Sequence, residues 1–400
     1  MTRTEQEGLL TFCDYKGFLQ PRTRFRGFKL AARLDDNVFG HVVAVPEPKA
    51  YFNNGQGVDY PLFTRGWTYQ EHQLSPRILV YGSCEMIYWC AESSHRDGGN
   101  EHPYWQEHNQ YAGSLFYQAQ LGASGAATEH PKSWGDIVEN YSQRHLTVED
   151  DKLPALAAVA ERYAEIAPVT EYLAGMWRQD LLLQCLWRVW DPKKTRRPKS
   201  YRAPSWSWAA LDGEVYPWTP PDDDATNDKT ERRVTCQLLH AETTLRSQKM
   251  RFGGASAGLM RVRAKMRPVL VLFNQDSRRP ALNLCHGRDP DATDEDLALL
   301  MQLGGVDSRL TLNIDVAADW SAGAEVVLWS VEVHANYHVG PQGEIQDGEG
   351  ILLQPVMEGA AASVDVFRRV GQISAQSQEY MREPYWFDER DSTWAVITIV

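Results

Sequence analysis

Around residue 70, the apolar and polar positions follow the period of a short helix. Trp67, Glu71 and Leu74 recur at intervals of four and three residues, which places them on one helix face. Thr64 is expected to cap the start of this helix. Pro76 is expected to end it, because proline cannot continue a helix. The pattern therefore predicts a helix that presents an indole and a carboxylate side by side.

Short apolar runs on either side of that helix predict strands. Ile78–Tyr81 and Met86–Cys90 flank a group of turn residues, which is typical of a β-hairpin. Earlier in the chain, Val42–Val45 precedes a proline and predicts one of two or three short strands within residues 1–60. Residues 93–132 are polar and rich in Gly, His and Ser, so they predict a long loop or insertion.

Helical spacing returns between residues 133 and 190. Ser133 and Asp136 form a capping-box pattern at the start of a helix. Its apolar stripe consists of Trp134, Ile137, Val138 and Tyr141. A second helix is expected after Thr147, with Pro154 near its first turn, and a third over Asp180–Trp190.

Beyond the helical segment the pattern changes from helix to strand. Tyr201–Ala209 alternates, so Trp206 and Trp208 share one face of a predicted strand. Two indoles on one strand face belong to a core more often than to a ligand groove. Seven further apolar runs bounded by turn residues predict an antiparallel β-rich domain. They are Thr235–Leu239, Leu259–Val271, Leu310–Ile314, Glu325–Val333, Ile351–Val356, Val364–Val370 and Thr393–Val400.

The chain around the first predicted helix resembles the last block of the heterokaryon-incompatibility (HET) domain of filamentous fungi. The family's pattern there is R-x-W-T-x-Q-E-x-x-L-S-x-R, and the hairpin that follows ends in an aromatic residue and a cysteine. The matching residues are Arg65, Trp67, Thr68, Gln70, Glu71, Leu74, Ser75, Arg77, Trp89 and Cys90. The family's two earlier blocks are not recognisable in residues 1–60, so we expect the chain to begin inside the domain.

Two later segments resemble HET proteins as well. Residues 134–156 follow W-x-x-I-V-x-x-Y-S-x-R-x-L-T-x-x-x-D-x-L-x-A-L, and residues 202–209 read R-A-P-S-W-S-W-A. The resemblance implies an α+β chain with a partial α/β, TIR-like HET unit, a helical middle segment and an antiparallel β-rich C-terminal domain. The expected boundaries are 1–92 for the C-terminal part of the HET domain, 93–132 for a loop or insertion, 133–192 for the helical segment, 193–202 for a basic linker and 203–400 for the β-rich domain.

HET proteins serve self/non-self recognition between fungal strains, and their activation leads to programmed cell death. The resemblance therefore implies a heterokaryon (vegetative) incompatibility protein that acts mainly through protein–protein interaction. Its expected partner is a protein of the incompatibility system, with self-association as a variant of the same idea. We expect no cofactor, no metal and no turnover from a chain that starts within the domain.

An enzymatic alternative rests on a second resemblance. HET domains are similar to TIR domains, which often cleave NAD and hold an essential glutamate four residues after a Trp or like residue. Trp67 and Glu71 have that spacing. A carboxylate beside an apolar ring can stabilise an oxocarbenium-like centre or bind a ribose hydroxyl. The alternative function is thus an NAD glycohydrolase with Glu71 as the acidic residue, Trp67 in the pocket and NAD as substrate.

Composition and charge narrow the partners and the compartment. The net charge of -12 at pH 7 argues against a surface built to bind the phosphate backbone of nucleic acids. The N-terminus has no apolar signal segment, no long apolar run predicts a membrane helix, and the 6 cysteines are scattered. A cytoplasmic protein with reduced thiols is therefore expected. The basic run at residues 193–199 suits a solvated linker, with nuclear import as the alternative.

Two further patterns are weaker indications of chemistry. Gly254–Gly258 spells G-x-S-x-G, but a nucleophile elbow needs a helix after it, and Leu259–Arg263 alternates like a strand. The nearest approaches to zinc-ligand spacing are Cys285–His286 and the pair His334 and His338. A loop thiol and two strand histidines are the simpler interpretation.

Overall fold

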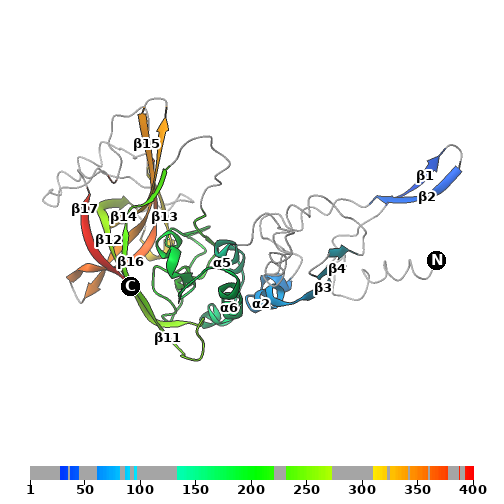
Figure 1. Cartoon of the computed structure of the whole chain (residues 1–400), viewed down its shortest axis with the longest axis horizontal. Helices are drawn as coiled ribbons and strands as arrows, with labels where there is room; N and C mark the ends of the chain where they lie inside the picture. Colours follow the sequence, from blue (N-terminus) through cyan, green and yellow to red (C-terminus); the bar gives the residue numbers. More distant parts are fainter. Residues whose placement is uncertain are drawn as a thin grey trace. The chain divides into compact units, whose positions relative to one another are not determined.

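A computed structural model gives the fold of the chain (Figure 1). It describes residues 28–34, 37–44, 61–81, 86–90, 94–96, 133–219, 231–272, 310–321, 325–340, 343–358, 361–376, 387 and 392–400. The chain divides into two compact units, Met1–Glu129 and His130–Val400. Short helices and one large sheet occur in the same chain, so the predicted α+β class is confirmed.

The first unit holds two small antiparallel sheets. One is the pair β1 (Phe28–Leu34) and β2 (Asn37–Ala44). The other contains the predicted hairpin, β3 (Arg77–Tyr81) and β4 (Met86–Cys90), which the structure confirms. A third strand, β5 (Ser94–Arg96), pairs with β4, so the expected loop over 93–132 is wrong at these three residues. Residues 97–132 lie outside the described part of the chain.

The predicted helix before the hairpin is α2 (Trp67–Leu74). It ends as expected: Ser75 is already extended, and Pro76 follows. Its start differs from the prediction. The cap residue is Gly66, with no side-chain cap bond, and Thr64 belongs to the preceding 3-10 turn η2 (Pro61–Thr64). The hydroxyl of Thr68 lies within hydrogen-bond distance of the carbonyls of Leu62 and Arg65, and the bond to Leu62 links α2 to η2.

The second unit begins with α5 (Trp134–Ser142), and its capping box is confirmed. The Ser133 N–H donates to Asp136 Oδ2 at 2.8 Å, and the Asp136 N–H donates to Ser133 Oγ at 3.2 Å. The second predicted helix is shorter than expected. Two 3-10 turns, η4 (Glu149–Asp151) and η5 (Pro154–Leu156), precede α6 (Ala157–Ile166).

The third predicted helix, over Asp180–Trp190, is present only as one short turn. The segment from 172 forms the tight pair β6 (Tyr172–Leu173) and β7 (Met176–Trp177), the turn η6 (Arg178–Asp180) and a single helical turn, α7 (Leu181–Gln184). The chain then extends into β8 (Arg188–Val189). The physical reason is a side-chain bond: the Gln184 amide binds both the N–H and the carbonyl of Trp177, at 3.1 and 3.0 Å, and holds α7 against β7.

Residues 193–202 lie inside the second unit rather than between two units. Arg196 pairs by a β-bridge with Asp212, and Arg197 Nε binds Asp319 Oδ2 at 2.8 Å. The Arg202 guanidinium is buried and donates to the carbonyls of Ala209 and Leu211 at 2.8 and 3.0 Å. These contacts anchor the basic run to the body of the unit, so it is not a free linker. Lys193, Lys194, Arg196 and Lys199 are nevertheless exposed, as expected for a solvated segment.

The alternating stretch Tyr201–Ala209 is not a strand. It runs through a loop into the 3-10 turn η7 (Trp208–Ala210). Ser207 Oγ accepts the Ala209 N–H at 3.0 Å, which starts that turn, and donates to the carbonyl of Ala174 at 2.5 Å. Trp206 and Trp208 are buried, so their interpretation as core is confirmed although the predicted strand is wrong.

All seven strands predicted for the C-terminal part are present in one eight-stranded sheet. Its members are β10 (Glu231–Val234), β11 (Gln237–Leu245), β12 (Ala255–Leu272), β13 (Leu310–Ile314), β14 (Glu325–Gly340), β15 (Gly343–Glu358), β16 (Ala361–Gln376) and β17 (Thr393–Ile399). At Met266, β12 changes its partner from β17 to β14, so five strands close into a ring in the order β12, β14, β15, β16, β17. The pairs are antiparallel, except for β16 with β17.

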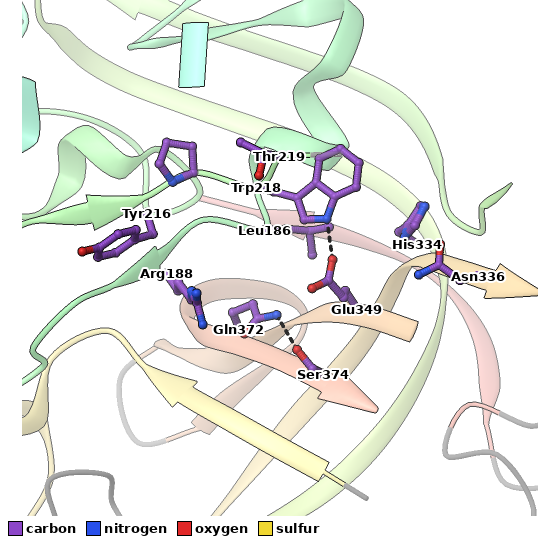
Figure 2. A pocket seen from close by; sticks show the side chains of 11 residues that line it. Leu186, Arg188, Tyr216, Trp218, Thr219, His334, Asn336, Glu349, Gln372 and Ser374 are labelled. Atoms are coloured by element: carbon purple, nitrogen blue, oxygen red, sulfur yellow. Dashed lines mark hydrogen bonds between the residues drawn. The ribbon is translucent and has the colours of Figure 1, made fainter. Parts of the chain in front are cut away.

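A small ladder lies over part of this ring. It pairs β8 with β9 (Val215–Tyr216), and the polypeptide after β9 passes above β14, β15 and β16 (Figure 2). Residues 217–219 therefore lie opposite residues of β14, β15 and β16 and enclose a pocket with them.

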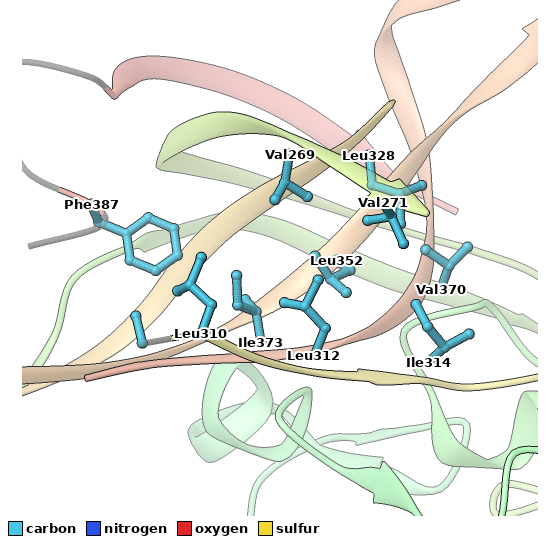
Figure 3. Packing of buried hydrophobic residues seen from close by; sticks show 11 residues of the cluster. Val269, Val271, Leu310, Leu312, Ile314, Leu328, Leu352, Val370, Ile373 and Phe387 are labelled. Atoms are coloured by element: carbon cyan, nitrogen blue, oxygen red, sulfur yellow. The ribbon is translucent and has the colours of Figure 1, made fainter. Parts of the chain in front are cut away.

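The core of the ring is aliphatic. Buried side chains from β12, β13, β14, β15 and β16 point toward one another, and the ring of Phe387 closes one end of the group (Figure 3). The cluster consists of Val269, Val271, Leu310, Leu312, Ile314, Leu328, Leu352, Val370, Ile373, Ala375 and Phe387. None of the helices in the described part of the chain has the length and apolar character needed to cross a membrane.

Candidate functional site

The predicted acid–indole pair lies on α2. Trp67 and Glu71 are one helical turn apart and both are exposed, with Trp67 at 39%. The Ser75 N–H and hydroxyl both donate to the carbonyl of Glu71, at 3.2 and 2.5 Å, and close the end of the helix. The main chain of Glu71 therefore ends the helix, while its side chain faces solvent.

The rest of the motif does not converge on this pair. Gln70 and Leu74 are half-buried, and Arg65 and Arg77 are exposed at the two ends of the helix. The buried face of α2 consists of Tyr69, His72 and Gln73. Those residues have the i, i+3, i+4 spacing of a packed helix face. Because two of them are polar, the sequence alone does not predict that this face is buried.

The second unit contains a pocket of about 280 Å³, and neither Trp67 nor Glu71 takes part in it. Its floor is a polar row across three ring strands. His334 of β14 lies directly opposite Glu349 of β15, and Glu349 lies opposite Ser374 of β16. Asn336 and Gln372 extend the row, each two residues along its own strand and therefore on the same face.

A β-bulge helps to build this floor. The register of β14 against β15 shifts between Glu332 and His334. Such a bulge inserts an extra residue and redirects the side chains after it, so bulges are common beside functional sites. Here the shift turns the side chains of His334 and Asn336 toward the pocket. In a regular strand the residues next to them would point there instead.

The roof of the pocket comes from the β8–β9 ladder and the polypeptide after it (Figure 2). Trp218 Nε1 donates to Glu349 Oε2, which ties the roof to the floor. The Trp218 ring also meets the His334 ring at 5.4 Å, nearly edge-on. On the other side, the Arg188 guanidinium lies 5.8 Å from the centre of the Tyr216 ring.

The electrostatics of the pocket centre on Glu349. Burial raises the pKa of its carboxyl group, whereas the hydrogen bond from Trp218 and the charge of Arg188 act in the opposite direction. Gln372 is occupied within the wall: its Oε1 accepts from Asn313 at 2.6 Å and its Nε2 donates to Ser374 at 2.9 Å. The groups left to meet a ligand are a carboxylate, an amide oxygen, a hydroxyl and a guanidinium.

The other sequence patterns do not form sites. Ser256, the centre of G-x-S-x-G, is exposed on β12, donates to the carbonyl of Thr244 at 3.2 Å and has no helix after it. Within the ranges that the structure describes, no group of three or more His, Cys, Asp or Glu side chains could hold a metal ion. Cys285–His286 lies outside those ranges. His334 is buried in the pocket wall just described.

Comparisons of the chain with protein-family models, with curated proteins and with solved structures find no match. The fold class stated above therefore depends on the structure alone.

Proposed function

We propose that this chain is a cytoplasmic recognition protein of a heterokaryon-incompatibility system and that it acts by binding another protein. The observation that carries the proposal is a group of exposed apolar side chains from one short segment of the first unit. Four large apolar side chains between residues 62 and 81 are exposed: Leu62, Trp67, Leu79 and Tyr81. Single exposed apolar residues are ordinary, but several from one short segment favour a docking surface.

The local geometry supports docking at this place. Leu79 and Tyr81 lie two residues apart on β3, so they project from the same face of the strand. Within the described residues, β3 is also an edge of its three-stranded sheet, in the order β3, β4, β5. An edge strand with exposed apolar side chains readily receives a partner chain.

The second unit supports the family assignment in a different way. The two later motif segments, residues 134–156 and 202–209, pack against each other. The indole N–H groups of Trp134 and Trp208 both donate to the carbonyl of Gly175 at 2.8 Å, and the Tyr141 ring meets Trp208 at 6.1 Å. The two segments are separated in sequence by residues 157–201, and they build one scaffold in the fold.

The alternative function is cleavage of NAD by Glu71. It is favoured by one observation: Trp67 and Glu71 do project from the same short helix with the spacing of the TIR motif, and both are accessible. Both functions place the active surface on the first unit, so variants of this unit distinguish them.

The test is a growth-arrest assay in a filamentous fungus. The chain is expressed in a strain that is incompatible with it, and the growth of the colony is measured. Tyr81→Ser and Leu79→Ser should abolish growth arrest if docking is the function, while Glu71→Gln should leave it intact. Met357→Ser, at an equally exposed apolar position of the second unit, is the matched control. Purified protein is incubated with NAD in parallel, and released nicotinamide is measured.

Each outcome separates the two functions. Loss of growth arrest in Glu71→Gln, together with nicotinamide release by the unsubstituted protein only, would replace docking by catalysis. If growth arrest persists in both β3 variants and no nicotinamide is released, the first unit neither docks a partner through β3 nor cleaves NAD. Far-ultraviolet circular dichroism of each variant confirms that the fold is retained.

A further inference from the structure

The pocket of the second unit presents opposite charges on its two sides. Arg188 comes from β8 in the roof and Glu349 from β15 in the floor, and in the view of Figure 2 Gln372 lies between them. In the described part of the chain the two side chains form no ion pair with each other. The charge of Arg188 nevertheless acts to lower the pKa of the Glu349 carboxyl group. The pocket is thus lined by a cation and an anion that are not paired with each other, and both are within reach of a bound ligand.

We propose that this pocket binds a small zwitterion of the α-amino acid class. The ligand's ammonium group is bound by Glu349 and Asn336, and its carboxylate is bound by Arg188. This function is separate from the docking surface of the first unit.

Unused acceptors on the floor favour an ammonium group there. Asn336 Oδ1 is buried and has no hydrogen-bond partner in the part of the chain that the structure describes. A buried polar atom without a partner is unfavourable, so a ligand that donates to it gains free energy. Trp218 occupies Glu349 Oε2 and leaves Oε1 available. An ammonium group has three donors and can serve both acceptors at once.

Arg188 decides between a zwitterion and a simple cation. Its guanidinium is exposed at the side of the pocket and carries five N–H donors suited to a carboxylate. It would repel the lysine or arginine side chain of a partner protein that reached for Glu349. A ligand that carries a carboxylate next to its ammonium group is instead attracted to the Arg188 guanidinium. We therefore favour a free amino acid.

The size and walls of the pocket fit this class. A volume of about 280 Å³ lies just below the range of about 300–1,000 Å³ for pockets that hold drug-sized ligands, which suits a smaller molecule. Leu186, Pro217 and the rings of Tyr216 and Trp218 line the roof, so the ligand's side chain meets apolar and aromatic surface. Aromatic faces beside a bound ammonium group add cation–π attraction.

The experiment is isothermal titration calorimetry of the full chain with each of the twenty L-amino acids at millimolar concentrations. For every amino acid that binds, the amine lacking the carboxylate and the acid lacking the amino group are titrated as well. The variants are Arg188→Gln and Glu349→Gln; the latter keeps an oxygen that can accept from Trp218. Arg261→Gln and Glu242→Gln, exposed positions outside the pocket, are the matched controls.

At least one amino acid should bind, and each pocket variant should weaken it about tenfold or more, as expected for loss of one charge-assisted bond. The controls should bind as the unsubstituted chain does. The acid lacking the amino group should be sensitive to Arg188→Gln and insensitive to, or improved by, Glu349→Gln. The amine should show the reverse.

Three results would overturn the proposal. The first is that no amino acid binds. The second is that binding is equal in the pocket variants and the controls. The third is that the amines bind as tightly as the amino acids and ignore Arg188→Gln, which would make the pocket a receptor for a cationic side chain. Because the first unit is unchanged in these variants, failure here is independent of failure of the docking function.

Discussion

In the second unit the motif tryptophans Trp134 and Trp208 are buried and donate to one shared carbonyl, whereas in the first unit Trp67 lies on the surface. The same contrast holds for charged residues. Arg202 of the later motif is buried and bound on several sides, while Glu71 of the earlier motif faces solvent. These motif residues of the second unit therefore maintain the fold, whereas the side chains of Trp67 and Glu71 in the first unit are available to another molecule.

The most severe test of this contrast is Arg369→Met. Arg369 is fully buried, binds Asp315 at 2.5 Å and the carbonyl of Cys185 at 3.1 Å, and stacks 3.3 Å from the centre of the Trp187 ring. Removing it leaves the Asp315 carboxylate buried without its cation, which should cost about 3–5 kcal/mol of unfolding free energy. Urea denaturation followed by tryptophan fluorescence measures the loss.

The control for that variant is Arg261→Met, an exposed arginine of β12. It should change the unfolding free energy by no more than about 0.5 kcal/mol. Equal stability of the two variants would show that the buried ion pair does not stabilise the second unit.

A smaller loss is expected from Gly175→Ala. Gly175 has a φ of +97°, and an added Cβ would lie 3.0 Å from Trp208 Nε1 and 3.2 Å from Leu153 Cδ2. Strain and crowding at the carbonyl that both indoles share should cost about 2 kcal/mol. Gly254→Ala is the matched control, because a Cβ there meets nothing within 4 Å. If the two alanine variants unfold at the same urea concentration, the shared carbonyl is not a key contact.

The pH dependence of the unfolding free energy tests the burial of Lys152 in the second unit. Burial and the neighbouring Arg202 lower the pKa of its ammonium group to about 7. In the unfolded chain this group titrates near 10.4, so between these values the unfolded state binds more protons and stability rises with pH. From pH 7 to 8.5 the gain should be about 1.5 kcal/mol.

Lys152→Met should abolish that rise, and Lys249→Met, at an exposed position, should retain it. The range stops at pH 8.5 because burial raises the pKa of the Cys185 thiol to about 12, and ionisation of that thiol in the unfolded chain lowers stability at higher pH. Urea denaturation at several pH values gives the slope. An unchanged slope in Lys152→Met would exclude Lys152 as its source.

The smallest effect is expected in the first unit. Trp67→Ser removes an exposed motif side chain, so the unfolding free energy should change by about 0.5 kcal/mol or less. Growth arrest in the fungal assay should nevertheless be lost. A large loss of stability would contradict the contrast between the units, since it would show that Trp67 serves the fold.

Much of the fold could be predicted from local pattern. The helix α2, the hairpin β3–β4, the capping box at Ser133 and all seven C-terminal strands follow from spacing and turn residues. Two of the failures have a related cause. Over 180–190 and 201–209 side-chain bonds to the backbone overrode the local pattern: Gln184 binds Trp177, seven residues earlier, and Ser207 binds the distant Ala174.

The candidate pocket could not be predicted. Its residues come from five separate strands, a turn and a loop, and the polar ones resemble ordinary exposed polar positions in the sequence. Only the bulge in β14 and the pairing of β14, β15 and β16 bring His334, Glu349 and Ser374 into one row.

By itself, the sequence determined the seven C-terminal strands, the burial of Trp206 and Trp208 and the acid–indole spacing of α2, because helix and strand periods are local properties. The tertiary structure alone decided that the sheet closes into a ring, that the basic run is anchored rather than free, and that two opposite charges face each other across a pocket. Those features depend on which distant segments meet, and that is set by packing of the whole unit rather than by any short stretch of chain.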